Sequence, residues 1–203
     1  DKQEIFSRDE LERIFTLDRI NKAPAVFDYK KLEWLNGHYI RERSTTELYE
    51  EILPFVQKAG LTDDPPSAEQ EAIIRGAVPL IQERLKYLGD APDLLRFLFE
   101  EPGEYDVDEM VPKKLDRAQT KALLEQVAPL VSDIPGLSDE ENEQVFRAKA
   151  AELETKLGNL LMPLRVAVTG SRVSPPLFGS IRLLGADRAK VRVERALQRL
   201  KES

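Results

Sequence analysis

Apolar residues recur at helical spacing along the chain, and short clusters of turn-forming residues separate the resulting stretches. Several stretches begin with a Ser or Asp followed three residues later by Glu or Gln, which is the spacing of a helix-capping box. Only the valine-rich segment 164–168 has a strand-like composition, and it is too short to build a sheet. The pattern therefore predicts an all-α fold with no substantial sheet.

Capping residues and chain-breaking residues predict where the helices begin and end. Pro24 is expected to break the chain before the second helix, and the apolar segments 91–99 and 177–184 predict two uncapped helices. The last helix is expected to be capped by Asp187, and the helix before the valine-rich segment is expected to continue to Leu157. Six capped helix starts are predicted, at Ser7, Asp28, Ser44, Ser67, Asp116 and Ser138.

The acidic segment 103–114 has no apolar stripe and is predicted to be a loop between two halves of the molecule. We expect two stacked helical sub-domains, covering residues 1–102 and 103–203. Base rates for apolar residues at helical spacing place most of the following side chains in the core: Phe27, Leu32, Trp34, Leu35 and Tyr39.

The composition is that of a soluble folded protein, with 41% hydrophobic and 33% charged residues among 203. No apolar run approaches the roughly 20 residues that span a bilayer, and no signal peptide is visible. The absence of cysteine excludes disulfides and thiolate catalysis and agrees with a cytoplasmic location. The abrupt start without Met leads us to expect a fragment of a longer protein.

The charge is unevenly distributed. The net charge of −7 argues against a protein that coats nucleic acid without specificity. Residues 61–160 carry 11 basic and 22 acidic side chains, whereas residues 161–203 carry 9 and 3. The basic end is either a surface that faces RNA or a solvated helix face, and the following side chains belong to it: Arg188, Lys190, Arg192, Arg195 and Arg199.

Recognisable catalytic groups are missing. The single histidine, His38, cannot supply a histidine-rich metal site, and we expect it to have a structural role. Chance pairs of carboxylates are inevitable among 37 acidic residues, and no phosphate-binding glycine loop is present. We therefore expect no catalytic, cofactor-binding or metal-binding residues in this chain.

Basic, turn-forming and aromatic residues are most closely interleaved in the segment 164–178. Arg165 and Arg172 flank a turn at Gly170, which permits backbone angles that other residues avoid. Such a loop can present guanidinium groups and a stacking surface, here Phe178, to unpaired bases. A plain connection between two core helices accounts for the same residues.

Two long motifs resemble the C-terminal half of bacterial glutamyl-tRNA synthetase, a class I enzyme. The motif KAPAVFDYKKLEWLNGHYIR at residues 22–41 has Ala23 where the family pattern has Ser. The motif LRVAVTGSRVSPPLFGSIRLLGADR at residues 164–188 has Val168 where the pattern has Leu. The resemblance covers essentially the whole chain and implies the anticodon-binding part of the enzyme, built from two helical cages.

The family attaches glutamate to tRNA(Glu) with ATP and Mg, using a Rossmann-type core whose signatures are absent from this chain. The resemblance therefore implies a monomeric tRNA-binding fragment that binds no cofactor itself and is inactive alone. It implies neither a DNA nor a membrane partner.

The second motif also implies residues that bind the anticodon. Arg165 and Phe178 match the family's pocket for the first anticodon base. The turn that packs on the middle base is matched by Ser174, Pro175 and Leu177.

Two further residues are implied upstream. Arg147 matches an arginine that approaches the anticodon backbone, and a solvated helix arginine is an equal alternative. At the third base, family members restricted to tRNA(Glu) tend to carry Arg at the position of Gln57. A fixed guanidinium favours cytosine and rejects guanine, whereas a glutamine amide can turn to suit either base. We therefore expect a non-discriminating enzyme that also accepts tRNA(Gln), unless Lys58 takes over the discrimination.

A helical protein-interaction scaffold without RNA binding explains the acidic middle and the missing catalytic groups equally well. The two functions differ in one geometric expectation. Scattered side chains favour the scaffold. Anticodon binding requires that the following side chains lie on one face: Arg147, Arg165, Arg172 and Phe178.

Overall fold

All regular elements of the computed structural model are helical within residues 3–19 and 26–202, the part of the chain that it describes. This confirms the all-α prediction, while the predicted break at Pro24 lies outside the described residues. Ten α-helices are present in this part: α1 (Arg8–Ile14), α2 (Tyr29–Arg41), α3 (Thr45–Lys58), α4 (Ala68–Ile81), α5 (Ala91–Phe99), α6 (Arg117–Val127), α7 (Asp139–Glu152), α8 (Leu157–Thr169), α9 (Leu177–Leu184) and α10 (Ala186–Glu202).

Side-chain caps begin six of these helices where the sequence predicts them. Asp28 accepts hydrogen bonds from the backbone N–H groups of Lys30 and Lys31 at the start of α2. The other five form complete capping boxes, in which a Glu or Gln three residues later reaches back to the cap backbone: Ser7, Ser44, Ser67, Asp116 and Ser138. Each cap of this kind stabilises its helix by about 1 kcal/mol.

The valine-rich segment 164–168 forms the last part of α8 and is not a strand, which corrects the one strand-like prediction. Both of its valines are fully buried. Burying a valine contributes roughly 1.5–3 kcal/mol, which outweighs a helix-propensity deficit of at most about 0.7 kcal/mol.

Two helix ends also differ from their predictions. Helix α7 ends at Glu152 and does not reach Leu157, because the chain reverses at Glu154, whose φ of 50° is left-handed. Asp187 lies in the first turn of α10 and does not cap it, since the helix already begins at Ala186.

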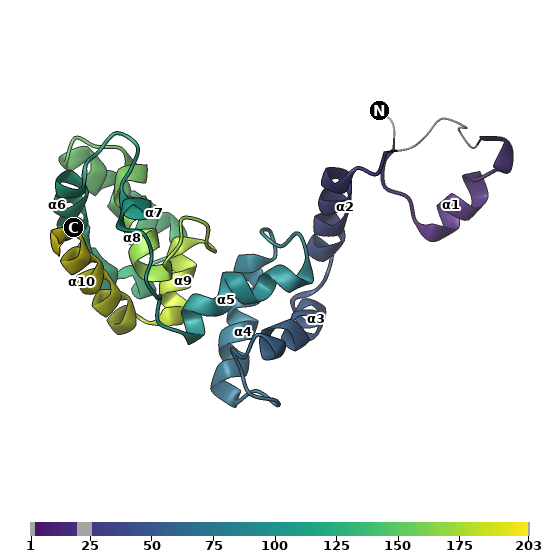
Figure 1. Ribbon diagram of the computed structural model, residues 1–203, viewed down its shortest axis with the longest axis horizontal. Coiled ribbons are helices and arrows are strands. Elements are labelled where there is room, and N and C mark those ends of the chain that lie inside the picture. The colour runs from purple at the N-terminus through teal and green to yellow at the C-terminus, as the bar shows by residue number, and fades with distance from the viewer. Residues whose placement is uncertain (1–2, 20–25, 203) are drawn as a thin grey trace.

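The helices form two groups, with α2–α5 on one side of the molecule and α6–α10 on the other (Figure 1). The segment predicted to be a loop joins them, but it contains a 3-10 turn, Val107–Met110, whose Met110 is fully buried. The boundary between residues 102 and 103 lies in this connection and stays a prediction.

Helix α9 packs against α4 and so links the two groups. Two glycines let these helices approach closely: a Cβ on Gly179 would lie 2.8 Å from Leu80 Cδ2, and one on Gly76 would lie 2.7 Å from Leu183 Cδ2. The contact places the end of α4 beside the start of α9.

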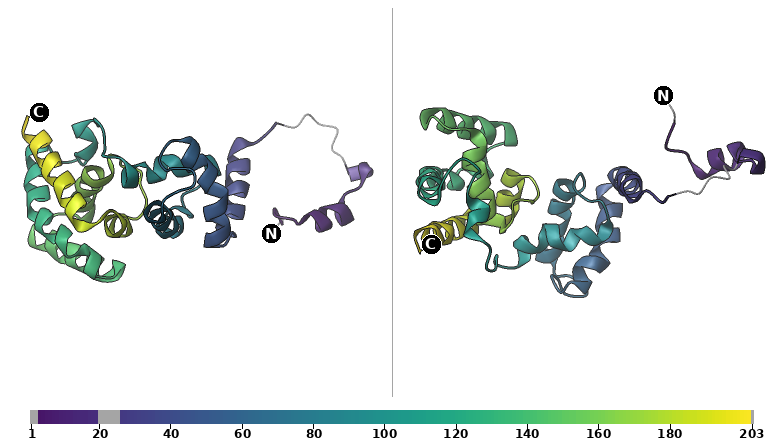
Figure 2. Two further views of the ribbon diagram at one scale, coloured as in Figure 1. Left: turned by 90° about the horizontal axis from the view of Figure 1, so that it is seen from below. Right: turned by 45° about the horizontal axis from the view of Figure 1, so that its top comes forward.

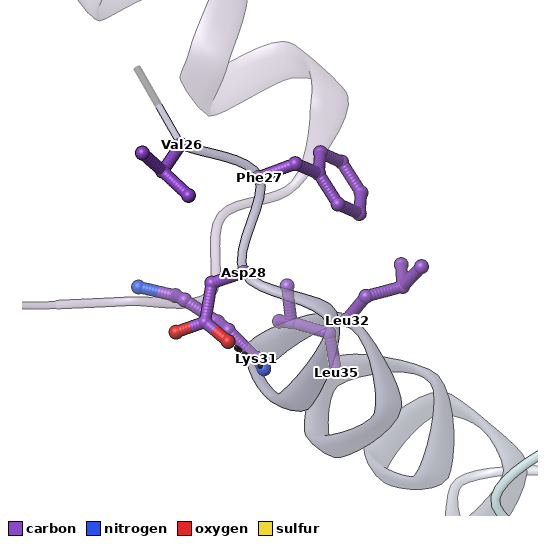
Figure 3. Close-up of a pocket in the computed structure, with 6 residues that line it drawn as sticks. All are labelled: Val26, Phe27, Asp28, Lys31, Leu32 and Leu35. Carbon is purple, nitrogen blue, oxygen red and sulfur yellow. Dashed lines mark hydrogen bonds between the residues drawn. The ribbon is translucent and has the colours of Figure 1, made fainter.

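The apolar side chains before and along the first half of α2 are mostly not in the core, which contradicts the base-rate prediction. Phe27 is 63% exposed and Trp34 is 46% exposed, while Leu35 is half-buried. Figure 3 shows Val26 and Phe27 over the first turns of α2, where Leu32 and Leu35 line the same hollow of about 440 Å³. Helix α1 buries none of its residues and lies apart from the two groups (Figure 2). The described residues therefore leave this apolar surface uncovered.

Four arginines of α10 contact the chain segment that connects the two groups, so part of the basic C-terminal end joins segments of the chain, while Arg188 and Arg195 stay partly exposed. Glu101 accepts hydrogen bonds from Arg188, Arg192 and Arg195 at 2.9–3.2 Å. Arg192 is 2% exposed and also donates to the carbonyls of Val168 and Glu100. Arg192 is turned towards protein acceptors because a buried guanidinium cannot be satisfied by water. Arg199 lies 4.6 Å from the centre of the Tyr105 ring.

We predict that Arg192→Met lowers the free energy of unfolding by about 2–4 kcal/mol, because it leaves buried carbonyl groups unpaired. Arg195→Met is the matched control, since Arg195 contacts the same carboxylate from a side chain that is 58% exposed. It is expected to cost less than about 1 kcal/mol. Urea unfolding of both variants measures the difference, and equal losses would show that burial of Arg192 does not set its contribution.

Candidate nucleic-acid interface

Arg165 fastens the loop between α8 and α9. Its Nη1 donates to Ser174 Oγ at 2.5 Å, to the Pro175 carbonyl at 2.8 Å and to the Ser174 carbonyl at 3.4 Å. Neither Nε nor Nη2 of Arg165 has a hydrogen-bond partner among the described residues, and neither atom is fully buried. One corner of the guanidinium therefore holds the loop, and the Nε–Nη2 edge stays available to a ligand.

The turn at Gly170 sets the direction in which the loop leaves α8. Gly170 has a φ of 75°, and a Cβ there would lie 3.1 Å from Pro102 Cβ. Arg172 turns towards the connecting segment, where its Nε donates to the Glu109 carbonyl at 2.7 Å and its Nη2 to two neighbouring carbonyls. Val173, 72% exposed, is the most exposed large apolar side chain of the loop.

Phe178 packs against a buried residue of α7, and Arg147 is the next residue along that helix, on its exposed side. The ring centre of Phe178 lies 5.5 Å from that of Phe146, which is fully buried on α7. Arg147 follows Phe146 in the sequence, is exposed, and pairs with Glu143 at 2.5–2.8 Å. Phe178 is half-buried, so it presents part of its ring and not a free aromatic face.

The three turn residues implied for the middle base lie mostly inside the loop. Ser174 is 3% exposed and Leu177 is 4% exposed, and Pro175 is also buried. Their side chains shape the loop, and its accessible surface comes from the exposed residues 171–173.

Gln57 lies away from this loop, near the end of α3. Its amide Nε2 donates to Asp64 Oδ1 at 3.1 Å and to the Asp63 carbonyl at 3.3 Å. Helix α3 packs mainly on α4 and α5, within the first group. The structure therefore does not bring Gln57 together with Arg165 and Phe178.

Arg84 is a site residue that the sequence reasoning missed. It is exposed, follows α4 by three residues, and is the one arginine among the described side chains without a hydrogen bond, ion pair or ring contact. Burial lowers the pKa of the Arg165 guanidinium, and the positive charge of Arg84 lowers it further, so the two charges act on the same region. No motif marks Arg84, because its proximity to Arg165 comes from the packing of α4 on α9.

The side chains gathered around the Arg165 loop are mainly hydrogen-bond donors. Within residues 3–19 and 26–202, no three His, Cys, Asp or Glu side chains are grouped as a metal site would require. No described helix is both long and apolar enough to cross a bilayer. Two neighbouring guanidinium groups beside an exposed loop suit phosphates and base edges.

Comparison with known proteins identifies a family and relatives that match most of this chain. Residues 47–197 match the model of the anticodon binding domain family. The chain is 41% identical to the glutamate–tRNA ligase of Treponema denticola over 216 residues, which cover 97% of this chain and 43% of the relative. It is 37% identical to that of Borreliella burgdorferi, with 99% and 41% covered. The chain thus spans about two fifths of the length of these relatives.

The fold also has a counterpart among solved structures. The glutamate-tRNA synthetase of Elizabethkingia anophelis superposes with a TM-score of 0.70 at 23% identity, covering 97% of this chain and 37% of that one. This likeness concerns the fold alone.

We predict that Ser174→Ala loosens the Arg165 guanidinium, because it removes the shortest of the three acceptors that hold Nη1. The free energy of unfolding should fall by about 1 kcal/mol, and exchange of the Arg165 guanidinium protons with water should accelerate.

Ser180→Ala is the control, since Ser180 is equally buried and its hydroxyl donates to the Pro176 carbonyl at 2.8 Å without touching Arg165. It should cost similar stability and leave the exchange unchanged. Nuclear magnetic resonance of the arginine side chains measures the exchange in both variants. Identical exchange in the two would contradict the role of Ser174.

Proposed function

Because the chain belongs to the anticodon-binding domain family and corresponds to the anticodon-binding part of glutamate–tRNA ligases, we propose that it binds the anticodon loop of a transfer RNA. The longer protein would attach glutamate to tRNA(Glu), using ATP and Mg bound outside this chain. This chain contributes binding energy and selectivity to that reaction, by positioning the tRNA for a catalytic site elsewhere.

The observation that supports this proposal is the pair Arg84 and Arg165. Their charges act on the same region, neither is ion-paired with a carboxylate of the described residues, and Arg165 is held in place by the loop itself. Most other described arginines are paired with acidic side chains or carbonyl groups, which leaves Arg84 and the Nε–Nη2 edge of Arg165 as the arginine donors available to phosphates. A net charge of −7 makes such a local site the suitable place for an RNA contact.

The geometry suits unpaired bases. The Nε–Nη2 edge of Arg165 offers two parallel N–H donors, the arrangement that binds a phosphate or a base edge in bidentate fashion. Val173 adds an exposed apolar contact, and the accessible part of Phe178 adds a partial stacking surface. Because Arg165 is already ordered, RNA binding loses less side-chain entropy there than at a mobile arginine.

We also propose, as the finer hypothesis, that the enzyme is non-discriminating and accepts tRNA(Gln) as well as tRNA(Glu). The support for this is the resemblance that aligns Gln57 with an arginine of restricted enzymes. The competing hypothesis is that Arg84, whose guanidinium has no partner in the described part of the chain, reads the third anticodon base, where a guanidinium favours cytosine and disfavours guanine. The two residues therefore define two competing forms of the proposal.

We predict that Arg84→Ala weakens binding of tRNA by about tenfold at low salt and reduces the slope of log affinity against log salt by about 0.7–0.9, the value for one phosphate contact. Arg43→Ala is the control, because Arg43 is an exposed arginine that lies near the end of α4, where its carbonyl accepts from Gln82 Nε2, but already has a carboxylate partner in Glu51. Fluorescence titration at stated salt concentrations measures the tRNA affinity and its salt dependence for both variants. Equal effects of the two variants would refute a specific role for Arg84, and no binding of either tRNA by wild type would favour the scaffold.

Substitutions at Gln57 and Arg84 distinguish the two forms of the proposal, in which one or the other residue sets the preference at the third anticodon base. If Gln57 sets the third-base preference, wild type binds both tRNAs with similar affinity, and Gln57→Arg shifts binding towards tRNA(Glu) by about tenfold or more. If Arg84 sets it, wild type prefers tRNA(Glu), Arg84→Gln relaxes the preference, and Gln57→Arg changes nothing. A ratio of the two affinities that neither variant changes would exclude both residues.

A further inference from the structure

Glu101 lies where the first helical group ends. Helix α5, whose last residue is Phe99, packs on α3 and α4, and Glu101 follows it at the start of the connecting segment, residues 100–116. The carboxylate of Glu101 accepts hydrogen bonds from α10, which belongs to the second group. Glu101 therefore joins the two groups through its own side chain.

Three arginines of α10 share this carboxylate. Its Oε1 accepts from the Nη2 atoms of Arg188 and Arg192, both at 3.2 Å, and its Oε2 accepts from Arg195 Nη1 at 2.9 Å. The three arginines are spaced by four and three residues, so they lie along one face of α10. An isolated surface ion pair contributes little, whereas a network of several charges constrains the groups that form it.

The carboxylate also separates like charges. Burial lowers the pKa of Arg192 most, and the charges of Arg188 and Arg195 lower it further, while the hydrogen bond and the charge of Glu101 raise it. A neutral side chain at position 101 would leave three guanidinium groups that repel one another at the junction of the two groups. Loss of the charge of Glu101 should therefore loosen α10 from the end of α5.

The RNA surface depends on how the two groups are oriented. Arg84 follows α4 in the first group, whereas Arg165 lies on α8 in the second. The groups also meet where α9 packs on α4 and, over a smaller area, on α5. A contact between helices leaves rotation about it possible, and an attachment between other elements, here α10 and the end of α5, restricts that rotation.

We propose that Glu101 is a positioning residue for the RNA surface: it holds α10 against the end of the first group and so sets how Arg84 lies relative to Arg165. The part that concerns RNA rests on the proposed function. The orientation of the two groups is a property of the free protein and can be measured without RNA.

The first test measures the distance between two spin labels in the absence of RNA, one label on each group. The chain has no cysteine, so Glu69→Cys on α4 and Gln144→Cys on α7, both at exposed positions, direct the labels. Pulsed electron paramagnetic resonance should give one narrow distance distribution for this doubly labelled chain. Glu101→Gln should broaden or displace the distribution, and it is expected to fold because the side chain is 47% exposed.

Glu104→Gln is the matched control for this test. Glu104 is an exposed carboxylate of the same segment, and it has no hydrogen bond or ion pair among the described residues. Its substitution should leave the distance distribution unchanged. A distribution in Glu101→Gln that equals that of the chain with native Glu101 would overturn the proposal.

The second test combines Glu101→Gln with Arg84→Ala in titrations with tRNA(Glu). Arg84→Ala is expected to weaken binding about tenfold in the wild-type background but only about threefold or less beside Glu101→Gln, because Arg84 is then no longer held in place relative to Arg165. Beside Glu104→Gln the tenfold effect should persist. Effects of Glu101→Gln and Arg84→Ala that simply multiply would show that Glu101 does not act through Arg84, and would contradict the positioning role.

The two tests separate this inference from the proposed function. If wild type binds no tRNA, the proposed function fails together with the RNA part of the inference. The label distances then still decide whether Glu101 fixes the orientation of the two groups.

Discussion

The close contact between α4 and α9 is the constraint on which the candidate RNA surface depends. Gly76 and Gly179 leave no Cβ where Leu183 and Leu80 pack, so the two helices approach more closely than larger residues would allow. Arg84 follows α4 and the loop held by Arg165 precedes α9. Two arginines that are 81 positions apart in the sequence thereby act on one region.

Arginine has two uses in this protein, and burial separates them. Where the guanidinium is buried, as in Arg192, it satisfies backbone carbonyls and joins segments of the chain. Where it is partly accessible, as in Arg165, one corner joins segments and one edge remains for a ligand. Only Arg84 among the described arginines has its whole guanidinium unengaged. The count of positive charges in a segment is therefore a poor guide to where unengaged guanidinium groups lie.

Much of the fold could be predicted from the sequence, because capping boxes such as those at Ser44 and Ser138 are local and act within one turn. The valine-rich end of α8 could not, since burial overrode its strand-like composition. The apolar residues around α2, such as Phe27, have core-like spacing but stay exposed, and the ring of Phe27 contacts that of Tyr29, two residues away, and not the core. For the site, the motif identified the Arg165 loop, whereas Arg84 depends on tertiary packing that no local pattern encodes.

The most direct measurement is competition for a labelled tRNA(Glu) between two fragments of that tRNA, the isolated anticodon stem and loop and the isolated acceptor and T arms. If the surface formed by Arg84 and the Arg165 loop binds the anticodon, the stem and loop should displace the tRNA almost completely. The acceptor and T arms should displace little at the same concentration and salt. Efficient displacement by the acceptor and T arms, with none by the anticodon stem and loop, would contradict the account.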